Sequence, residues 1–331
     1  MRAIREELAA LEGKSVESVE EEAAAKAEEQ KARQARIEDE KAAAAEARKT
    51  AAVASSDGRH LTLPETGEDM VAMAAGAVER GLRDGVTRQT VRFALVPLDA
   101  QTASEDDAFE GWPGGPQQMY AVASKPLTME LLARVRTTDE VAPGRTGQPK
   151  VAAQDVLAFD GSGLVTAEAA EAAGGARGDA QALVGANTDA KYTSDIEEID
   201  AAMGPERLFL LVNPFWRGIE SWGVNILQPN ARRRAQEVVF DRCGFGRPEA
   251  NTFALLRFSV RGERCAALRC YPYPWQVFAY LEDAAYPDLE RPVRLGTLPA
   301  DGEPTSEAVA ALINAEPDFK LAKTQRRMNR R

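Results

Sequence analysis

The stretch Leu208-Phe209-Leu210-Leu211-Val212 decides the fold class, because five consecutive apolar residues leave no polar face for water. A strand of this kind is buried on both sides, as central strands are when helices cover both faces of a sheet. Asn213-Pro214-Phe215-Trp216-Arg217 follows, and Asn before Pro favours a turn. We therefore expect an α/β protein with this strand at the centre of its sheet.

The rest of the chain supplies further elements in alternation. A helix is expected from about Thr66 to Leu82, because apolar residues follow Thr66 at helical spacing. Other expected elements are a strand over 91–96, helices over 127–135, 194–203 (capped by Ser194), 232–240 and 306–315 (capped by Ser306), a short strand over 156–159, a hairpin over 253–260 and 265–271, and a strand over 275–281. Loops are expected at 138–150 and at the Ala/Gly-rich stretch 167–190. This order predicts a single mixed-sheet, Rossmann-like, three-layer domain over residues 58–318.

The two ends of the chain differ in composition from this domain. Residues 1–57 are rich in Ala, Glu and Lys, which predicts a long charged helical arm, solvated or partly disordered. A partner-binding arm is the alternative. Residues 319–331 form a basic tail that we expect to be solvated, with contact to an anionic surface as the alternative.

Charge and hydropathy exclude several classes of partner. The net charge is −11, which repels phosphate backbones, so no nucleic-acid partner is expected. RNA binding by the run Arg232-Arg233-Arg234 and the tail stays a third alternative, and it predicts strong salt dependence. The run 208–212 is far shorter than the ~20 residues of a membrane helix, so we expect at most a peripheral membrane contact. The cysteines Cys243, Cys265 and Cys270 suggest free thiols, with the last two on opposite faces of a strand.

No catalytic residue, metal ligand or cofactor site is predicted. The single histidine, His60, lies in a linker, which removes most Ser-His-Asp, Cys-His and His-metal schemes. Gly161-Ser162-Gly163 lacks the remaining residues of a dinucleotide or P-loop motif, so a turn at a strand end is expected. The acidic residues between Asp195 and Asp200 spread around a helix surface instead of forming an acid/base pair.

Two segments are candidates for binding. Trp112 lies beside a Pro-Gly turn, where it either anchors the loop into the core or lines a groove. Asn213 lies at the exit of the central strand, where open α/β sheets bind ligands, although it can also tie down its own turn. The candidate binding residues are Trp112, Pro113, Gly114, Gly115, Gln118, Asn213, Pro214, Trp216, Arg217 and Trp275.

The order of five segments carries a family resemblance. These segments are Leu63-Pro64-Glu65-Thr66, the Val91 strand, Trp112-Pro113-Gly114-Gly115 with Gln117-Gln118, Leu211 to Arg217, and Tyr271-Pro272-Tyr273-Pro274-Trp275-Gln276-Val277-Phe278. Over roughly residues 61–281 the chain resembles a plastid and cyanobacterial domain of unknown function. That family includes the low-PSII-accumulation proteins of chloroplasts and an extension of a chloroplast adenylate kinase. The stretch 167–190 departs from a compact version of the domain.

The resemblance implies a plastid protein, stromal or thylakoid-associated, although no targeting segment is recognised in the chain. It implies no catalytic residues, and the candidate residues above are carried over only as positions of the family pattern. The first hypothesis is a non-enzymatic assembly or interaction factor for photosynthetic complexes, with protein partners and a link to photosystem II biogenesis. The alternative is a small-molecule or nucleotide-binding protein, an enzyme included, with its site at the exit of the 208–212 strand. Without a P-loop, the adenylate kinase activity of the fused relative is not expected.

Overall fold

The computed structural model describes residues 61–95, 112–137, 148–157, 160–169, 175–222, 230–282, 290–321 and 323–329, with Glu28 and Lys31. The expected arm over residues 1–57, apart from Glu28 and Lys31, lies outside these ranges, as does His60. The chain forms two compact units, and the larger one comprises Leu63–Glu282 with Glu290–Arg331. Every element below belongs to this larger unit.

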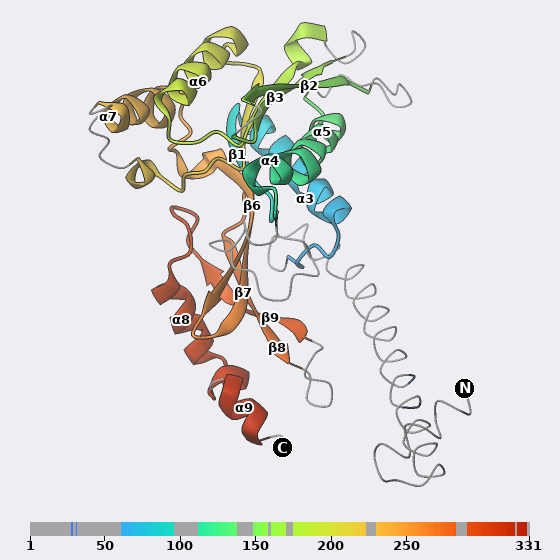
Figure 1. Cartoon of the computed structure of the whole chain (residues 1–331), viewed down its shortest axis with the longest axis vertical. Coiled ribbons are helices and arrows are strands. Elements are labelled where there is room, and N and C mark those ends of the chain that lie inside the picture. The colour runs from blue at the N-terminus through green and yellow to red at the C-terminus, as the bar shows by residue number, and fades with distance from the viewer. Residues whose placement is uncertain are drawn as a thin grey trace. The chain divides into compact units, whose positions relative to one another are not determined.

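The described residues form a nine-stranded mixed sheet in the order β2-β3-β4-β5-β1-β6-β7-β8-β9 (Figure 1). The neighbouring strands β4, β5, β1 and β6 are parallel, and antiparallel pairs extend the sheet on both sides. The strands are β1 Arg88–Arg92, β2 Lys150–Leu157, β3 Ser162–Glu168, β4 Ala180–Val184, β5 Leu208–Val212, β6 Asn251–Val260, β7 Glu263–Cys270, β8 Trp275–Glu282 and β9 Glu290–Leu298. The predicted α/β class with one mixed sheet is confirmed.

Strand β5 lies inside the parallel part of the sheet, between β4 and β1. All five of its residues are buried, as its sequence predicts. Phe209 and Leu211 pack into a core with residues of α6 Ala190–Met203 and α7 Ala231–Ala235. Because side chains alternate along a strand, the other three residues point to the opposite face.

Helices cover both faces of the parallel strands. The helices α3 Gly67–Arg83 and α5 Lys125–Arg134 pack together on one face, and α6 and α7 lie on the other (Figure 1). Helix α3 begins as predicted, because Thr66 Oγ1 accepts from the Asp69 N–H (3.0 Å) and the Asp69 carboxylate accepts from the Thr66 N–H (3.2 Å). The other helical segments are α4 Gly115–Met119, the π-helices η3 Tyr120–Ser124 and η7 Gln236–Arg242, α8 Ser306–Ala315, α9 Lys323–Asn329, and 3₁₀ turns at Gly175–Gly178, Ile219–Ser221, Pro248–Ala250 and Pro317–Phe319.

The Ala/Gly-rich loop predicted over 167–190 contains a strand that was not predicted, and the short strand predicted over 156–159 begins earlier. Strand β2 begins at Lys150 instead of residue 156. Strand β3 ends inside the Ala/Gly-rich stretch, and β4 lies wholly within it. Ala167, Ala180 and Ala182 are buried there, and their small side chains let helix α5 approach the sheet. These strands were missed because apolar and polar residues do not alternate clearly along them. Residues 138–147 and 170–174 lie outside the described ranges.

Three smaller expectations also change. Helix α6 begins after Asp189, whose carboxylate accepts from the Lys191 N–H (2.8 Å), so Ser194 is not its cap. Helix α8 is capped by Thr305 instead of Ser306. Strand β9 was not predicted, because it is a half-exposed, polar strand at the end of the sheet order.

The basic tail is not wholly solvated, because two of its described residues are buried against the sheet. Phe319 is buried, and Arg326 of α9 forms a two-point ion pair with Glu263 of β7 at 2.8 and 2.7 Å. Lys323 lies 3.1 Å from Glu290 and 3.6 Å from the buried Glu282. These inward-facing carboxylates therefore hold α9 against the sheet.

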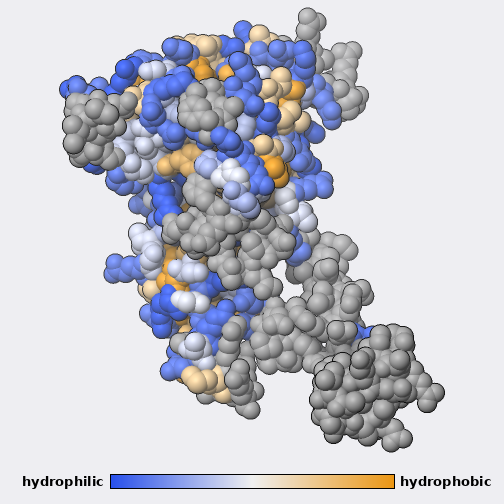
Figure 2. Space-filling view, viewed as in Figure 1, coloured by the Kyte–Doolittle hydropathy of each residue, from blue (hydrophilic) through white to orange (hydrophobic). Residues whose placement is uncertain are grey.

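The three cysteines lie inside the domain. Cys243, Cys265 and Cys270 are buried free thiols. Cys265 packs on the α8 side, whereas Cys270 faces Met73 of α3, so the predicted opposite faces are confirmed. Among the described residues, no helix combines the length and the apolar character needed to cross a bilayer. The coloured part of the surface in Figure 2 is mostly hydrophilic, with separate hydrophobic spots.

Candidate functional site

Asn213 extends the pairing of β5 with its neighbour beyond the end of the strand. Its backbone N–H donates to the carbonyl oxygen of Val91 (2.9 Å), which continues the parallel pairing of β5 with β1. Its side chain then imitates one more residue of the strand: Oδ1 accepts from the Phe93 N–H (3.1 Å) and Nδ2 donates to the Phe93 carbonyl (2.8 Å). The residue has a φ of 47°, a conformation that Asn tolerates better than most residues. Asn213 is therefore used by the fold, as one of the two sequence interpretations proposed.

Arg92, the last residue of β1, holds the turn that follows Asn213. Its Nη1 donates to the Pro214 carbonyl (3.3 Å), and its Nη2 donates to the Trp216 carbonyl. The Trp216 ring is 5% exposed and packs on Trp222 with the ring centroids 4.6 Å apart. The turn is thus fixed both by the guanidinium group and by core packing.

Trp275 supports the same region from the adjoining part of the sheet. Its ring is fully buried, and its Nε1 donates to the Gly302 carbonyl (2.7 Å) in the loop after β9. The next residue, Glu303, lies with its carboxylate between Arg92 (3.5 Å) and Arg217 (3.6 Å). Trp275 therefore positions the loop that carries Glu303.

A cavity of about 740 Å³ lies where these groups meet. Its walls come from β1, the exit of β5, η7, the segment before β6 and the loop after β9: Thr90, Arg92, Trp216, Arg217, Gly218, Ile219, Gln236, Phe240, Asp241, Phe245, Gly246, Arg247, Pro248, Asn251, Ala300, Asp301, Gly302 and Glu303. The volume is within the range of small-molecule sites. The lining combines apolar rings with arginine, carboxylate and amide groups.

The position of this cavity follows from the topology. The chain leaves β1 toward α4 and α5 on one face of the sheet, whereas it leaves β5 toward α7 on the other face. The two strands are parallel neighbours, so their carboxyl ends mark a change in the direction of the connections. Open α/β sheets bind ligands at such points.

The Trp112 segment serves the loop that follows β1. The Trp112 Nε1 donates to the Leu95 carbonyl (3.0 Å), and the Gly114 N–H donates to Gln118 Oε1 (2.8 Å). Pro113 and Gly114 form the turn before α4, and Gly115 has a φ of +64°. None of these residues lines the cavity at the strand exit. Of the candidate residues, the structure brings Trp216 and Arg217 to the cavity, with Asn213, Pro214 and Trp275 behind them.

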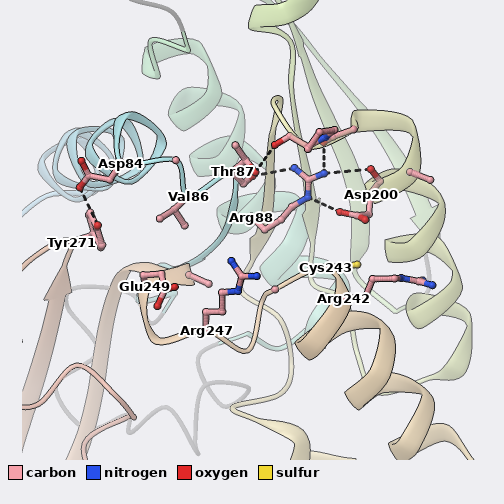
Figure 3. Close-up of a pocket in the computed structure, with 16 residues that line it drawn as sticks. Asp84, Val86, Thr87, Arg88, Asp200, Arg242, Cys243, Arg247, Glu249 and Tyr271 are labelled. Atoms are coloured by element: carbon pink, nitrogen blue, oxygen red, sulfur yellow. Dashed lines mark hydrogen bonds and ion pairs between the residues drawn. The ribbon is translucent and has the colours of Figure 1, made fainter.

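A second cavity, of about 780 Å³, lies at the amino end of β1 (Figure 3). Arg88 is bound within the protein, since its Nε lies 2.6 Å from Asp200 and its Nη1 donates to the Arg207 carbonyl (2.8 Å). Tyr271 donates to Asp84 (3.0 Å). The buried Cys243 is a poor nucleophile, because burial raises the pKa of its thiol to about 12. The Arg88–Asp200 and Tyr271–Asp84 pairs of this cavity are therefore already bound within the protein.

Sequence reasoning missed Arg92, Glu303 and Asn251 as cavity residues. Arg92 offered a weak signal, because a charged residue directly follows the apolar Val91 near a strand end. Glu303 offered none, since its loop follows a strand that was itself not predicted.

The arginines of the cavity are suited to an anion. Within the described ranges, no three His, Cys, Asp or Glu side chains are grouped to hold a metal ion.

Comparison with known proteins gives one match. The model of a family described as "Domain of unknown function (DUF1995)" matches residues 64–291, which is more than half of the chain. No curated protein and no solved structure matches the chain significantly.

Proposed function

From the premise that the chain belongs to the domain-of-unknown-function family DUF1995, we propose that it is a plastid assembly or interaction factor for photosynthetic complexes that acts without catalysis. The resemblance to the low-PSII-accumulation proteins supports the process and the compartment. The structure supports a role as a scaffold.

The side chains of the family pattern are occupied with building the domain. Both polar atoms of the Asn213 amide bind the Phe93 backbone, and the Trp275 indole binds Gly302. The Trp216 ring belongs to a hydrophobic core. A pattern that encoded catalysis would place reactive groups in a cleft. These residues instead hold strand ends and loops in place, which suits a rigid domain that offers its surface to partners.

The surface suggests the chemistry of the partner contact. Figure 2 shows a mainly hydrophilic face, and the large hydrophobic residues most exposed among those described, such as Val122 and Met328, are dispersed along the chain. A polar contact relies on complementary charge, which salt screens. We therefore expect the partner complex to weaken as ionic strength rises.

Affinity purification tests this proposal. The full chain, tagged at its C-terminus and expressed in chloroplasts, is purified without crosslinking, and co-purified proteins are quantified by mass spectrometry. We expect photosystem subunits or assembly factors to be enriched several-fold over an unrelated tagged stromal protein, with less enrichment at 0.5 M salt (an amount that shortens the screening length to a few Å). Recovery of no photosynthetic subunit or assembly factor would refute the proposal.

The cavity beside Trp216 favours a second candidate function, the binding of a small molecule. The expected readout is a rise in the melting temperature of the full chain with a metabolite, because a ligand that binds only the folded state stabilises it.

A further inference from the structure

The Glu303 carboxylate lies between two guanidinium groups of the cavity. Its two oxygens face the Nε atoms of Arg92 and Arg217, at 3.5 and 3.6 Å. The Arg92 and Glu303 side chains are 15% and 19% exposed, whereas Arg217 is 57% exposed. A carboxylate thus bridges one nearly buried cation and one that faces solvent.

The two contacts of Glu303 are loose. Strong N–H to carboxylate bonds measure about 2.7–2.9 Å, so both separations exceed that of a charge-assisted hydrogen bond. Arg92 directs its Nη atoms to the backbone of Pro214 and Trp216 instead of to Glu303. The carboxylate is therefore held mainly by charge, and an external anion with better geometry can replace it.

Displacement of Glu303 requires only its side chain to move. The preceding residue, Gly302, is fixed by the Trp275 indole at 2.7 Å. The backbone of the loop can stay in place while the Glu303 side chain rotates toward solvent. Arg92 likewise stays in place, because it is bound to the turn of β5.

The rest of the cavity suits an organic body attached to an anionic group. Trp216, Ile219 and Phe245 provide apolar wall, and the volume of about 740 Å³ exceeds what a bare inorganic ion needs. Asn251 also lines the cavity, and its Oδ1 is buried without a hydrogen-bond partner among the described residues. The NH₂ group of the Asn251 amide is a hydrogen-bond donor, which suits the oxygens of an anionic ligand.

We propose that this cavity binds a small organic phosphate or carboxylate, with Arg92 and Arg217 as its anion site and Glu303 as an internal competitor that the ligand displaces. The inference rests on the second candidate function above. The aromatic wall holds the body of the ligand, and Asn251 bonds to its polar atoms. The bridging carboxylate offsets one of the two guanidinium charges while the cavity is empty.

Paired probes test the anion requirement in the full chain. Melting temperature and calorimetric titration are measured with AMP against adenosine, and with benzoate against benzamide, each pair differing in the anionic group. We expect at least one anionic member to bind and its neutral partner to bind at least ~10-fold more weakly. AMP alone would indicate a phosphate, and benzoate alone a carboxylate. Absence of binding by both anions, in the native chain and in Glu303→Gln, would overturn the proposal.

Variants test the assigned residues with the probe that binds. Glu303→Gln removes the competing charge and is expected to raise the affinity ~10-fold, whereas Arg217→Gln is expected to lower it by a similar factor. Arg232→Gln is the matched control, because it removes the same charge from an exposed position outside the cavity. Unchanged affinity in both cavity variants, or equal loss in the control, would contradict the assignment.

Anion binding by the cavity and partner binding by the domain can be tested separately. Purification of the Arg217→Gln chain from chloroplasts reports partners independently of the titration. Anion binding without partners would leave the cavity assignment intact and remove the interaction factor, and partners without anion binding would do the reverse.

Discussion

At the scale of single residues, Asn213 shows how one amide can finish a strand. Asn213→Ala removes both hydrogen bonds to Phe93 and places alanine at a φ of 47°. We expect the free energy of unfolding to fall by about 2–4 kcal/mol, measured by urea denaturation. Asn213→Gly also loses these hydrogen bonds, but glycine adopts this φ without strain. Its free energy of unfolding should therefore fall by about 1 kcal/mol less than that of Asn213→Ala.

The control for Asn213 is Asn230→Ala, because Asn230 is exposed and makes no capping bond with its side chain. We expect a change within about 0.5 kcal/mol for the control. Equal effects at the two positions would contradict the role of Asn213. The sequence allowed a prediction that Asn213 ties down its turn, because Asn-Pro is a local signal. It gave no sign of Phe93 as the partner, since that pairing depends on which strand lies beside β5.

At the scale of elements, the turn before β3 fits directly against helix α4. Gly161 has a φ of +75°, and a Cβ there would lie 2.3 Å from the Pro116 carbonyl oxygen. We expect Gly161→Ala to destabilise the domain by about 3 kcal/mol or more, from backbone strain and overpacking together. Gly262→Ala, at a φ of +77° with open space around it, should cost only about 1 kcal/mol. Thermal unfolding measures the effect, and an equal fall in melting temperature in both variants would contradict the close contact.

Helix α9 depends on a buried ion pair with β7. Arg326 and Glu263 are 6% and 2% exposed, so removing one partner leaves a buried charge. Arg326→Met is expected to lower the free energy of unfolding by about 3–5 kcal/mol in the native chain. The same change should lower it clearly less in a chain that already carries Glu263→Gln. Urea denaturation of the four chains of this cycle gives the coupling energy. Additive effects, or an equal loss in the exposed control Arg232→Met, would show that the pair does not hold α9.

The elements also show where sequence reasoning succeeds. Strand β5, helix α3 and the β6–β7 hairpin were predicted, because each carries its pattern within a few neighbouring residues. Strands β2, β3 and β4 were missed or displaced, because alanine and glycine fit both a loop and a tightly packed strand. The contact of Arg92 with Glu303 joins residues far apart in sequence, so only the completed sheet could reveal it.

At the scale of the whole molecule, the three buried thiols link stability to pH. Burial raises the pKa of Cys243 and of Cys265 to about 12, and it also raises the pKa of Cys270. In the unfolded chain these thiols ionise near pH 8.5. Their contribution to stability is therefore complete below that pH and is lost as the pH rises toward 12. We expect the free energy of unfolding to decrease by up to about 1.4 kcal/mol per pH unit for each such thiol.

Thiol labelling measures the same property directly. At pH 8, Ellman's reagent should react with none of the three cysteines in the native chain within minutes and with all of them in urea. A chain with all three cysteines changed to alanine should lose less stability between pH 8 and pH 11. Rapid labelling of any thiol in the native chain would contradict its burial.

The ion pair between α9 and β7 has a consequence for protein synthesis. The ribosome makes Glu263 well before Arg326, and domains generally begin to fold from their N-terminal side during translation. Until Arg326 leaves the ribosome, the sheet has to keep a carboxylate in its interior without a counter-ion, or leave that part of β7 open. Helix α9 therefore completes the domain, and a nascent chain that stalls shortly before Arg326 presents chaperones and proteases with an unfinished sheet.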